Sequence, residues 1–558
     1  MSCNSDWLKK PLMNSRFPKF LRPAILMRAS NLINEKPIST RGIEELKEKK
    51  RKELKRLFYL EDSGSVLQGM KLIDNLQWLG VAHHFEDEID FSLEKLSQWH
   101  SCGEDHDDLH STALRFRLLR QHMKPISCDV FEKFVKDENI RKSLIKDKEG
   151  LLNLYEASYL GSNDEDIILF EAMKFSEIQL KTSVETMRPD CHVISRRISR
   201  ALELPRHRRM VRLESRLGIE EYYDMQTNHS CPLLQLAKLD YNNVQLLHQM
   251  ELTQLTRWWK QLGVGDKLGH FARNSMGECF LWTVGIFPNP KYSEVRVEMA
   301  KVIAILLVID DVFDKYGTFH DLSLFTRAIQ RWDANAIETL PEYMKVCYMA
   351  LYNTTKEIAH KVLKQLGKDI HHLLKGSWIH TVEAYMIEFK WFSRGEQAVS
   401  AEEYVENGVA TAGAYMALVH AFFLMGEGLT DHNIKLMSKP YPKLFSASGR
   451  ILRLWDDLGT SKEEEDRGDN ASIIGVLMKE KNLSTENEAQ QHIKQLILKL
   501  WKDLNGNLVD SNPWPLSIIN VCFNMSRTAQ VFYQHQQYSY ASNVKNIADS
   551  IFWEPIEL

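Results

Sequence analysis

Three aspartates follow a wholly apolar run in the middle of the chain. Residues 302–309 carry only aliphatic side chains, which predicts a helix that is buried on every side. Asp310, Asp311 and Asp314 come directly after this run. On an α-helix Asp310 and Asp314 share one face, and Asp311 lies about 100° away. Three carboxylates at the end of a buried helix repel one another and are costly to ionise, so a cation must offset their charge.

A divalent metal ion fits this first cluster. Mg²⁺ prefers oxygen ligands and combines a few carboxylates with waters and phosphate oxygens, and Mn²⁺ is the alternative ion. The competing interpretation is a solvated helix end with chance acids, although acids at that end oppose the helix dipole. The D-x-x-D spacing alone does not separate the two interpretations.

A second oxygen-rich cluster lies about 145 residues further on. Asp456, Thr460 and Glu464 stand at i, i+4 and i+8, so they form one stripe over two helical turns and could hold a second Mg²⁺. Arg453 lies one turn earlier, and its guanidinium suits a phosphate anion. The competing interpretation is an ordinary charged helix end. Together, the clusters predict two helices that face each other across a cavity, with divalent ions clamping a diphosphate between them.

The elements that carry these residues are predicted to be helices. Helical apolar spacing recurs from residues 41–60 onward, and no alternating strand series or repeat period is present, so the fold class is predicted to be all-α. Polar turn-forming residues predict a boundary near 225–232. The uncharged stretch 407–426 is long enough to span a bilayer, but its glycines, Thr411, Tyr415 and His420 favour a buried core helix.

Composition excludes several classes of protein. The 558 residues include 71 Lys+Arg and 75 Asp+Glu, and a net charge of -4 gives no electrostatic case for a nucleic-acid partner. The eight cysteines are scattered without a C-x-x-C pair, so neither a structural zinc site nor a disulfide framework is predicted. The N-terminus lacks the apolar segment of a secretory signal. We expect a monomer without a membrane span.

The motifs together resemble those of plant class I terpene synthases. D-D-x-x-D matches at Asp310, Asp311 and Asp314, and the second family motif matches from Asp456 to Glu464. Residues 111–122 are similar to a hallmark of the family's N-terminal domain. The resemblance covers roughly residues 40–558 and implies two α-helical domains. These are an N-terminal helical, barrel-like domain at 41–224 and a catalytic metal-binding domain at 225–558, after an N-terminal arm at 1–40.

The resemblance also implies a reaction. Metal ions draw the diphosphate from geranyl or farnesyl diphosphate, and an allylic cation forms in an apolar, aromatic-lined pocket. Arg273 and Arg453 match positions that bind the diphosphate, and Trp282 matches one that stabilises the cation, although an ordinary core aromatic is an equally good interpretation of Trp282. The stretch from Gly408 to Gly413 resembles the family's kinked pocket helix.

Two departures from the family pattern bear on the product. The usual R-x-R is Arg273-Asn-Ser275 here, which puts the sequestering role of the second arginine in doubt. The N-terminal tandem arginine followed by a distant tryptophan is absent, because Lys9-Lys10 is followed by Lys19 at that distance. This absence resembles linalool and nerolidol synthases and predicts water capture to an acyclic alcohol. The alternatives are a cyclic sesquiterpene synthase and a catalytically dead helical scaffold.

The N-terminal arm leaves two compartments open. Its basic bias would suit a transit peptide or a loose basic arm. Because the helical core that resembles the family begins near residue 41, a cleaved peptide would consume nearly the whole arm. We therefore expect a cytosolic protein, with the plastid as the alternative.

Overall fold

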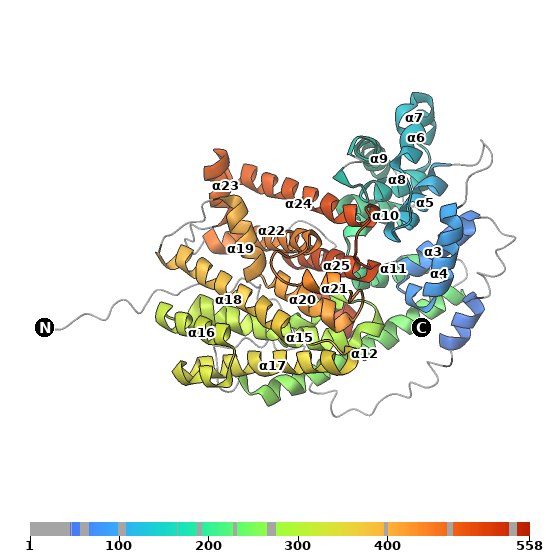
Figure 1. Cartoon of the computed structure of the whole chain (residues 1–558). Helices are drawn as coiled ribbons and strands as arrows, with labels where there is room; N and C mark the ends of the chain where they lie inside the picture. Colours follow the sequence, from blue (N-terminus) through green and yellow to red (C-terminus); the bar gives the residue numbers. More distant parts are fainter. Residues whose placement is uncertain are drawn as a thin grey trace. The chain divides into compact units, whose positions relative to one another are not determined.

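The computed structural model describes most of the chain as helices joined by short turns (Figure 1). It describes residues 45, 47–55, 66–98, 108–163, 166–186, 192–226, 231–264, 275–394, 400–465, 472–534 and 544–558. No β-strand occurs in these ranges, and the predicted all-α fold class is confirmed. The predicted break at 225–232 lies between α11, which ends at Met225, and α12, which begins at Pro232.

The internal contacts divide the chain into two compact units. Unit 1 contains Met250–Phe287 and Tyr292–Ile497, and unit 2 contains Glu35–Gln249, Pro288–Lys291 and Leu498–Leu558. The second unit therefore combines residues from both halves of the sequence. The domain limits 41–224 and 225–558 remain a prediction, because contacts alone do not define the segments that fold independently.

The helices of unit 1 carry both carboxylate clusters. They are the C-terminal part of α12 (Pro232–Leu262), α14 (Met276–Ile286), α15 (Ser293–Asp311), η9 (Val312–Tyr316), α16 (Phe319–Arg331), η10 (Ala334–Thr339), α17 (Glu342–Leu366), α18 (His371–Arg394), α19 (Ala401–Thr411), α20 (Ala414–Met425), α21 (Asp431–Lys435), α22 (Lys443–Glu465), α23 (Ile473–Lys481) and the first part of α24 (Glu486–Val509).

Helix α15 is the central helix of unit 1. It contacts α14, α17 and α20, and every residue of the apolar run 302–309 is buried, as predicted (Figure 1). Arg296 fixes its N-terminal half. The Arg296 guanidinium binds Glu251 of α12 at 2.6 and 2.9 Å and donates to the Phe287 carbonyl at 2.8 Å. This buried pair sets the direction of the helix that ends in the three aspartates.

The stretch 407–426 is largely buried, as predicted, and it forms two helices that meet within Gly408–Gly413, where the family resemblance implied a kink. α19 ends at Thr411, α20 begins at Ala414, and their axes differ by 45°. Gly413 adopts φ +71°, a left-handed conformation that favours glycine. A Cβ at Gly413 would also lie 2.3 Å from Leu306 Cδ2 on α15, so the close approach of the two helices requires glycine there.

Within the described ranges, no single helix is both long and apolar enough to cross a membrane, and only the bent pair α19 and α20 reaches the required length and hydropathy together.

Unit 2 is built from shorter helices around its own core. They are α3 (Val66–Trp78), η2 (Ala82–His84), α4 (Glu86–Gln98), α5 (Leu109–Gln121), η3 (Cys128–Phe131), α6 (Glu132–Lys136), α7 (Glu138–Leu144), α8 (Lys148–Ser158), α9 (Asp166–Thr186), α10 (His192–Glu203), η6 (Arg206–Arg208), α11 (Val211–Met225), the first part of α12, η8 (Pro290–Tyr292, up to Lys291), the last part of α24, α25 (Leu516–Tyr533) and α26 (Val544–Phe552).

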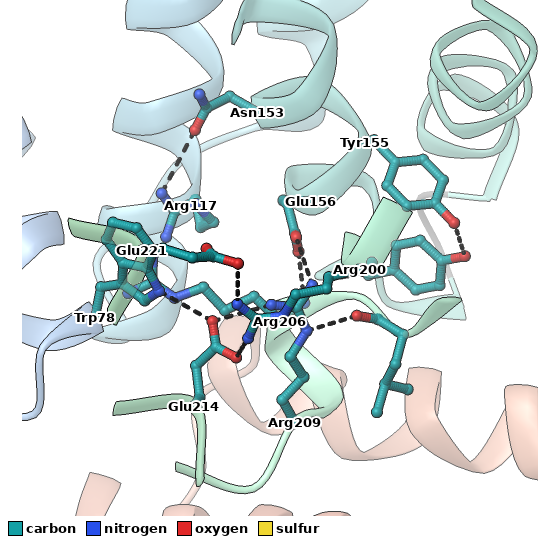
Figure 2. Close-up of polar contacts among 12 residues, drawn as sticks. Trp78, Arg117, Asn153, Tyr155, Glu156, Arg200, Arg206, Arg209, Glu214 and Glu221 are labelled. Carbon is teal, nitrogen blue, oxygen red and sulfur yellow. Dashed lines mark hydrogen bonds and ion pairs between the residues drawn. The ribbon is translucent and has the colours of Figure 1, made fainter. Parts of the chain in front are cut away.

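A buried ion network joins several of these helices, and Figure 2 shows Glu214 near its centre. Glu214 accepts hydrogen bonds from Trp78 Nε1 at 3.0 Å, Arg200 Nη2 at 2.6 Å and Arg209 Nη1 at 2.9 Å. Burial alone would raise the pKa of Glu214, but Arg209 and Arg200 hold it below its ordinary value. The negative charge of Glu214 is neutralised by these arginines, which indicates that the network has a structural role.

Side-chain amides of α12 bind the backbone of residues 552–556 in unit 2. The Gln249 amide donates to the Phe552 carbonyl at 2.7 Å, and Asn242 both donates to and accepts from Ile556 at 2.8 Å. Earlier in the same C-terminal segment, Asn505 lies 2.9 Å from the Nε2 atom of buried His207. Asn242 and Gln249 on α12 therefore hold the backbone of Phe552 and Ile556 in place.

Candidate metal and diphosphate site

The first carboxylate cluster lies where α15 changes its helical form. Asp310 and Asp311 are the last α-helical residues, and Asp314 lies in the π-helical turn η9. The amide of Gly317 closes this turn on the Val312 carbonyl at 2.8 Å. The sequence predicted a continuous α-helix; the π-turn changes the angular relation of Asp314 to the other two acids. Such turns often occur at functional sites.

The three side chains of the cluster are almost fully buried. Asp310, Asp311 and Asp314 are 1%, 2% and 7% exposed. Lys315, in the same π-turn, places its Nζ 2.5 Å from Asp311 Oδ1. The alternative of a solvated helix end is therefore wrong for this cluster, since its acids lie inside unit 1.

The second cluster is equally buried. Asp456 and Thr460 are 4% and 6% exposed and lie one turn apart on α22, where the Thr460 hydroxyl donates to the Asp456 carbonyl at 2.9 Å. The predicted stripe is thus present for its first two members. Glu464 lies in the last turn of α22, but its side chain is outside the described residues.

Arg453 is enclosed by three polar partners. Its Nε and Nη2 atoms bind Asp457 at 3.1 and 2.8 Å, and Nη2 donates to the Tyr404 hydroxyl at 2.7 Å. Glu388 Oε1 lies 3.7 Å from the same Nη2. Burial alone would lower the pKa of Arg453, but Asp457, Tyr404 and Glu388 hold it well above its ordinary value, so the guanidinium remains charged.

One atom of that guanidinium is left for a ligand. Nη1 of Arg453 is buried and has no hydrogen-bond partner among the described residues. The partners on Nε and Nη2 fix the plane of the group and hence the direction of Nη1. The predicted diphosphate-binding role of Arg453 is compatible with this arrangement, although part of its charge is balanced internally.

Helix α18 connects the two clusters. The Tyr385 ring stacks on Phe313 of the π-turn, with ring centroids 5.2 Å apart and an angle of 22°. Three residues later, Glu388 approaches Arg453. The neighbouring positions 385 and 388 thus contact residues that flank the first and the second cluster, and the two clusters belong to one region of unit 1.

The donor set of this region fits divalent cations. Among the described residues of this region, six carboxylates are buried and two cations, Lys315 and Arg453, lie beside them, so these eight side chains carry a net formal charge of -4; the acids are Asp310, Asp311, Asp314, Glu388, Asp456 and Asp457. Carboxylate and hydroxyl oxygens are the ligands that Mg²⁺ and Mn²⁺ accept, and thiol or imidazole ligands are absent from this set. Divalent ions bound here would stabilise this concentration of buried carboxylates.

The structure describes two of the three remaining residues, Trp282 and Ser275. Trp282 is 5% exposed on α14, which packs against α15, so its side chain belongs to the same unit as the clusters. Arg273 lies outside the described residues. Ser275 directly precedes α14 and makes no side-chain capping bond.

Three residues of the Arg453 surroundings were missed from the sequence. Tyr404 and Glu388 lie 49 and 65 positions away from Arg453, so no local spacing relates them. Asp457 could have been found, because it follows Arg453 at i+4, the spacing of a helical ion pair. The ion-pair spacing was overlooked because Asp457 also lies in the second family motif, Asp456 to Glu464.

Two family models match the chain. Residues 27–202 match the terpene synthase N-terminal domain, and residues 260–503 match the metal-binding domain of the terpene synthase family. The described residues of both clusters lie inside the second match. These matches confirm an N-terminal and a metal-binding part, as the sequence motifs predicted.

Whole-chain comparisons agree with the family models. The chain is 50% identical to a geraniol synthase of Ocimum basilicum, with 97% of this chain and 96% of the relative covered. It is 49% identical to an R-linalool synthase of the same plant, with 96% and 93% covered. It also resembles the crystal structure of isoprene synthase from grey poplar in complex with three Mg²⁺ ions and dimethylallyl-S-thiolodiphosphate. That match has a TM-score of 0.83 and 32% identity, over 93% of this chain and 99% of the other.

The comparisons correct the expected compartment. Both Ocimum basilicum relatives are named as chloroplastic, which contradicts the cytosolic expectation. The expectation was wrong because it depended on the short arm before residue 41, and arm length alone does not distinguish the two compartments. The level of identity over nearly the whole chain, together with both domain matches, shows that this chain belongs to the plant terpene synthase family and is a terpene synthase lyase.

Proposed function

We propose that this enzyme ionises geranyl diphosphate with the help of Mg²⁺ and captures the cation with water, giving an acyclic monoterpene alcohol such as linalool. The observation that carries the proposal is the pair of buried carboxylate clusters in unit 1, which α18 connects through Tyr385 and Glu388. The ten-carbon substrate and the acyclic product are supported by the names of the geraniol and R-linalool synthases to which the chain is similar.

The site residues would bind the metal ions and the diphosphate of the substrate. Asp310, Asp311 and Asp314 would hold metal at the first cluster, and Asp456, Thr460 and Glu464 would hold it at the second. The bound ions supply Lewis acidity that stabilises the negative charge on the departing diphosphate. Arg453 offers Nη1 to a diphosphate oxygen from a fixed plane, and Arg273 would add a second guanidinium.

Water is the second reactant in the proposed reaction. The C1–O bond breaks and its electron pair leaves with the diphosphate. A lone pair of water then forms a C–O bond at C3 for linalool, or at C1 for geraniol, and the oxonium loses one proton. The buried side chains of the two clusters would keep bulk water from the ionising bond, and Trp282 would present an aromatic face to the allylic cation.

The plastid is the proposed compartment, because the relatives with chloroplastic names align over nearly their whole length. A fluorescent fusion of residues 1–40 should accumulate in plastids. A fusion that stays in the cytosol would contradict this part of the proposal.

The activity is tested by incubating the purified full chain separately with geranyl and farnesyl diphosphate. Volatile products are identified by chiral gas chromatography with mass detection, with and without Mg²⁺. We expect an acyclic ten-carbon alcohol from geranyl diphosphate, and none after chelation. Nerolidol as the dominant product would move the proposal to the fifteen-carbon substrate. Ring-bearing products would contradict the acyclic outcome, and no product from either substrate would overturn the activity itself.

A further inference from the structure

A lysine lies inside the first carboxylate cluster. Lys315 follows Asp314 in the π-turn, and its ammonium lies 2.5 Å from Asp311 Oδ1. The Lys315 side chain is 15% exposed and that of Asp311 is 2% exposed. This contact is a partly buried, charge-assisted hydrogen bond, and fully exposed ion pairs of similar length are more strongly screened by solvent.

This position has two electrostatic consequences of opposite sign. Toward an incoming divalent cation, the ammonium is a repelling charge, and it occupies an oxygen of a predicted metal ligand. Toward a diphosphate, the same ammonium is an attracting charge beside the leaving group. Interactions over a few ångströms in a site that excludes water are strong enough for both effects to be measurable.

We propose that Lys315 is a counter-ion that serves Asp311 before the metal ions bind and the diphosphate after they have bound. The inference depends on the proposed function, because it assigns a role within the same site. In the metal-free enzyme, Lys315 reduces repulsion among Asp310, Asp311 and Asp314. In the loaded enzyme, a cation on Asp311 leaves the ammonium to face the diphosphate.

The test measures two binding events without turnover. Mg²⁺ is titrated into the metal-free full chain by calorimetry, and inorganic diphosphate is then titrated into the chain saturated with Mg²⁺. The variants are Lys315→Met, which removes the charge, and Lys315→Arg, which keeps it. Lys345→Met is the matched control, because Lys345 forms an exposed 2.6 Å pair with Glu342 on α17.

We expect Lys315→Met to bind Mg²⁺ about tenfold more tightly and diphosphate about tenfold more weakly, a change of about 1.4 kcal/mol in each direction. Lys315→Arg and Lys345→Met should stay close to the parent in both titrations. A merely structural lysine would weaken both events together, and that result, or no change in either, would overturn the inference. If the parent enzyme itself bound neither Mg²⁺ nor diphosphate, the proposed function would fail instead.

Discussion

Gly408 lies directly against Arg453. A Cβ at Gly408 would be 2.7 Å from Arg453 Nε and 2.8 Å from its Cγ and Cδ. The backbone of α19 therefore contacts the stem of the guanidinium that is predicted to bind the diphosphate. The position requires glycine because of this close approach, although residue 408 itself has ordinary helical geometry.

Replacing Gly408 by alanine should displace Arg453. The added methyl group must push the arginine away from Asp457 and Tyr404, which should cost about 1–3 kcal/mol of stability and at least tenfold in kcat/KM. Thermal unfolding and steady-state kinetics measure the two effects. Gly376→Ala on α18 is the matched control, since its new Cβ would meet no atom within 4 Å. Unchanged kinetics in Gly408→Ala would show that the arginine's position is unimportant.

Tyr404→Phe should weaken diphosphate binding while leaving the fold intact. The substitution removes the hydroxyl that accepts from Arg453 at 2.7 Å, but the ring can keep its stack on Trp391 at 6.0 Å. Loss of this charged hydrogen bond should cost about 1–2 kcal/mol and raise the inhibition constant of inorganic diphosphate about tenfold. Competitive inhibition measures that constant. Tyr352→Phe on α17 controls for the loss of a hydroxyl elsewhere in unit 1; an inhibition constant equal to the parent's would exclude a positioning role for Tyr404.

Asp314→Asn should separate folding from metal binding. In the absence of metal, removal of one of three buried carboxylates relieves repulsion, so the melting temperature should stay equal or rise. Added Mg²⁺ should then give little of the stabilisation seen in the parent, and turnover should fall at least 100-fold. Thermal unfolding with and without Mg²⁺ provides the measurement, and Glu357→Gln, at an exposed site of α17, is the control. A parent-like Mg²⁺ response in Asp314→Asn would contradict its role as a ligand.

His420 should make the folded state sensitive to mild acid. Burial lowers the pKa of His420 to about 4, from an ordinary value of 6.5. Because the folded state favours the neutral ring, the full stability is present above about pH 6.5 and is lost as the pH falls toward 4. His420→Gln should reduce this loss by up to about 3 kcal/mol. Chemical denaturation from pH 7 to 4.5 measures it, and exposed His432→Gln should leave the pH dependence as in the parent. An identical slope for His420→Gln would exclude this histidine as a source.

Local patterns predicted most of the site, and long-range contacts account for what they missed. The apolar run 302–309 and the spacing of Asp456 and Thr460 are properties of single helices, so the sequence shows them directly. The π-turn at Asp314 depends on the hydrogen bond from Gly317 to Val312, a shift of one position that side-chain periodicity does not reveal. The family resemblance implied a kink between Gly408 and Gly413, but the contact of Gly413 with Leu306 of another helix is not visible in the local sequence.

The division into units was less accessible from sequence than the helices were. Chain order predicts one domain after residue 225, and the contact grouping adds that Leu498–Leu558 lies in unit 2 without testing the domain limits. Part of this grouping depends on single side-chain amides, such as those of Asn242 and Gln249. Their hydrogen-bond partners lie some 300 positions away, so no local pattern reveals them.

That arrangement constrains how the polypeptide matures during synthesis. Unit 2 contains α3 to α11, but its hydrogen bonds to Phe552 and Ile556 can form only after codon 556 has been translated, some 300 codons after those of Asn242 and Gln249. Completion of unit 2 therefore waits for these late residues, and a stop codon placed shortly before α26 would deprive α11 and α12 of their contacts with it.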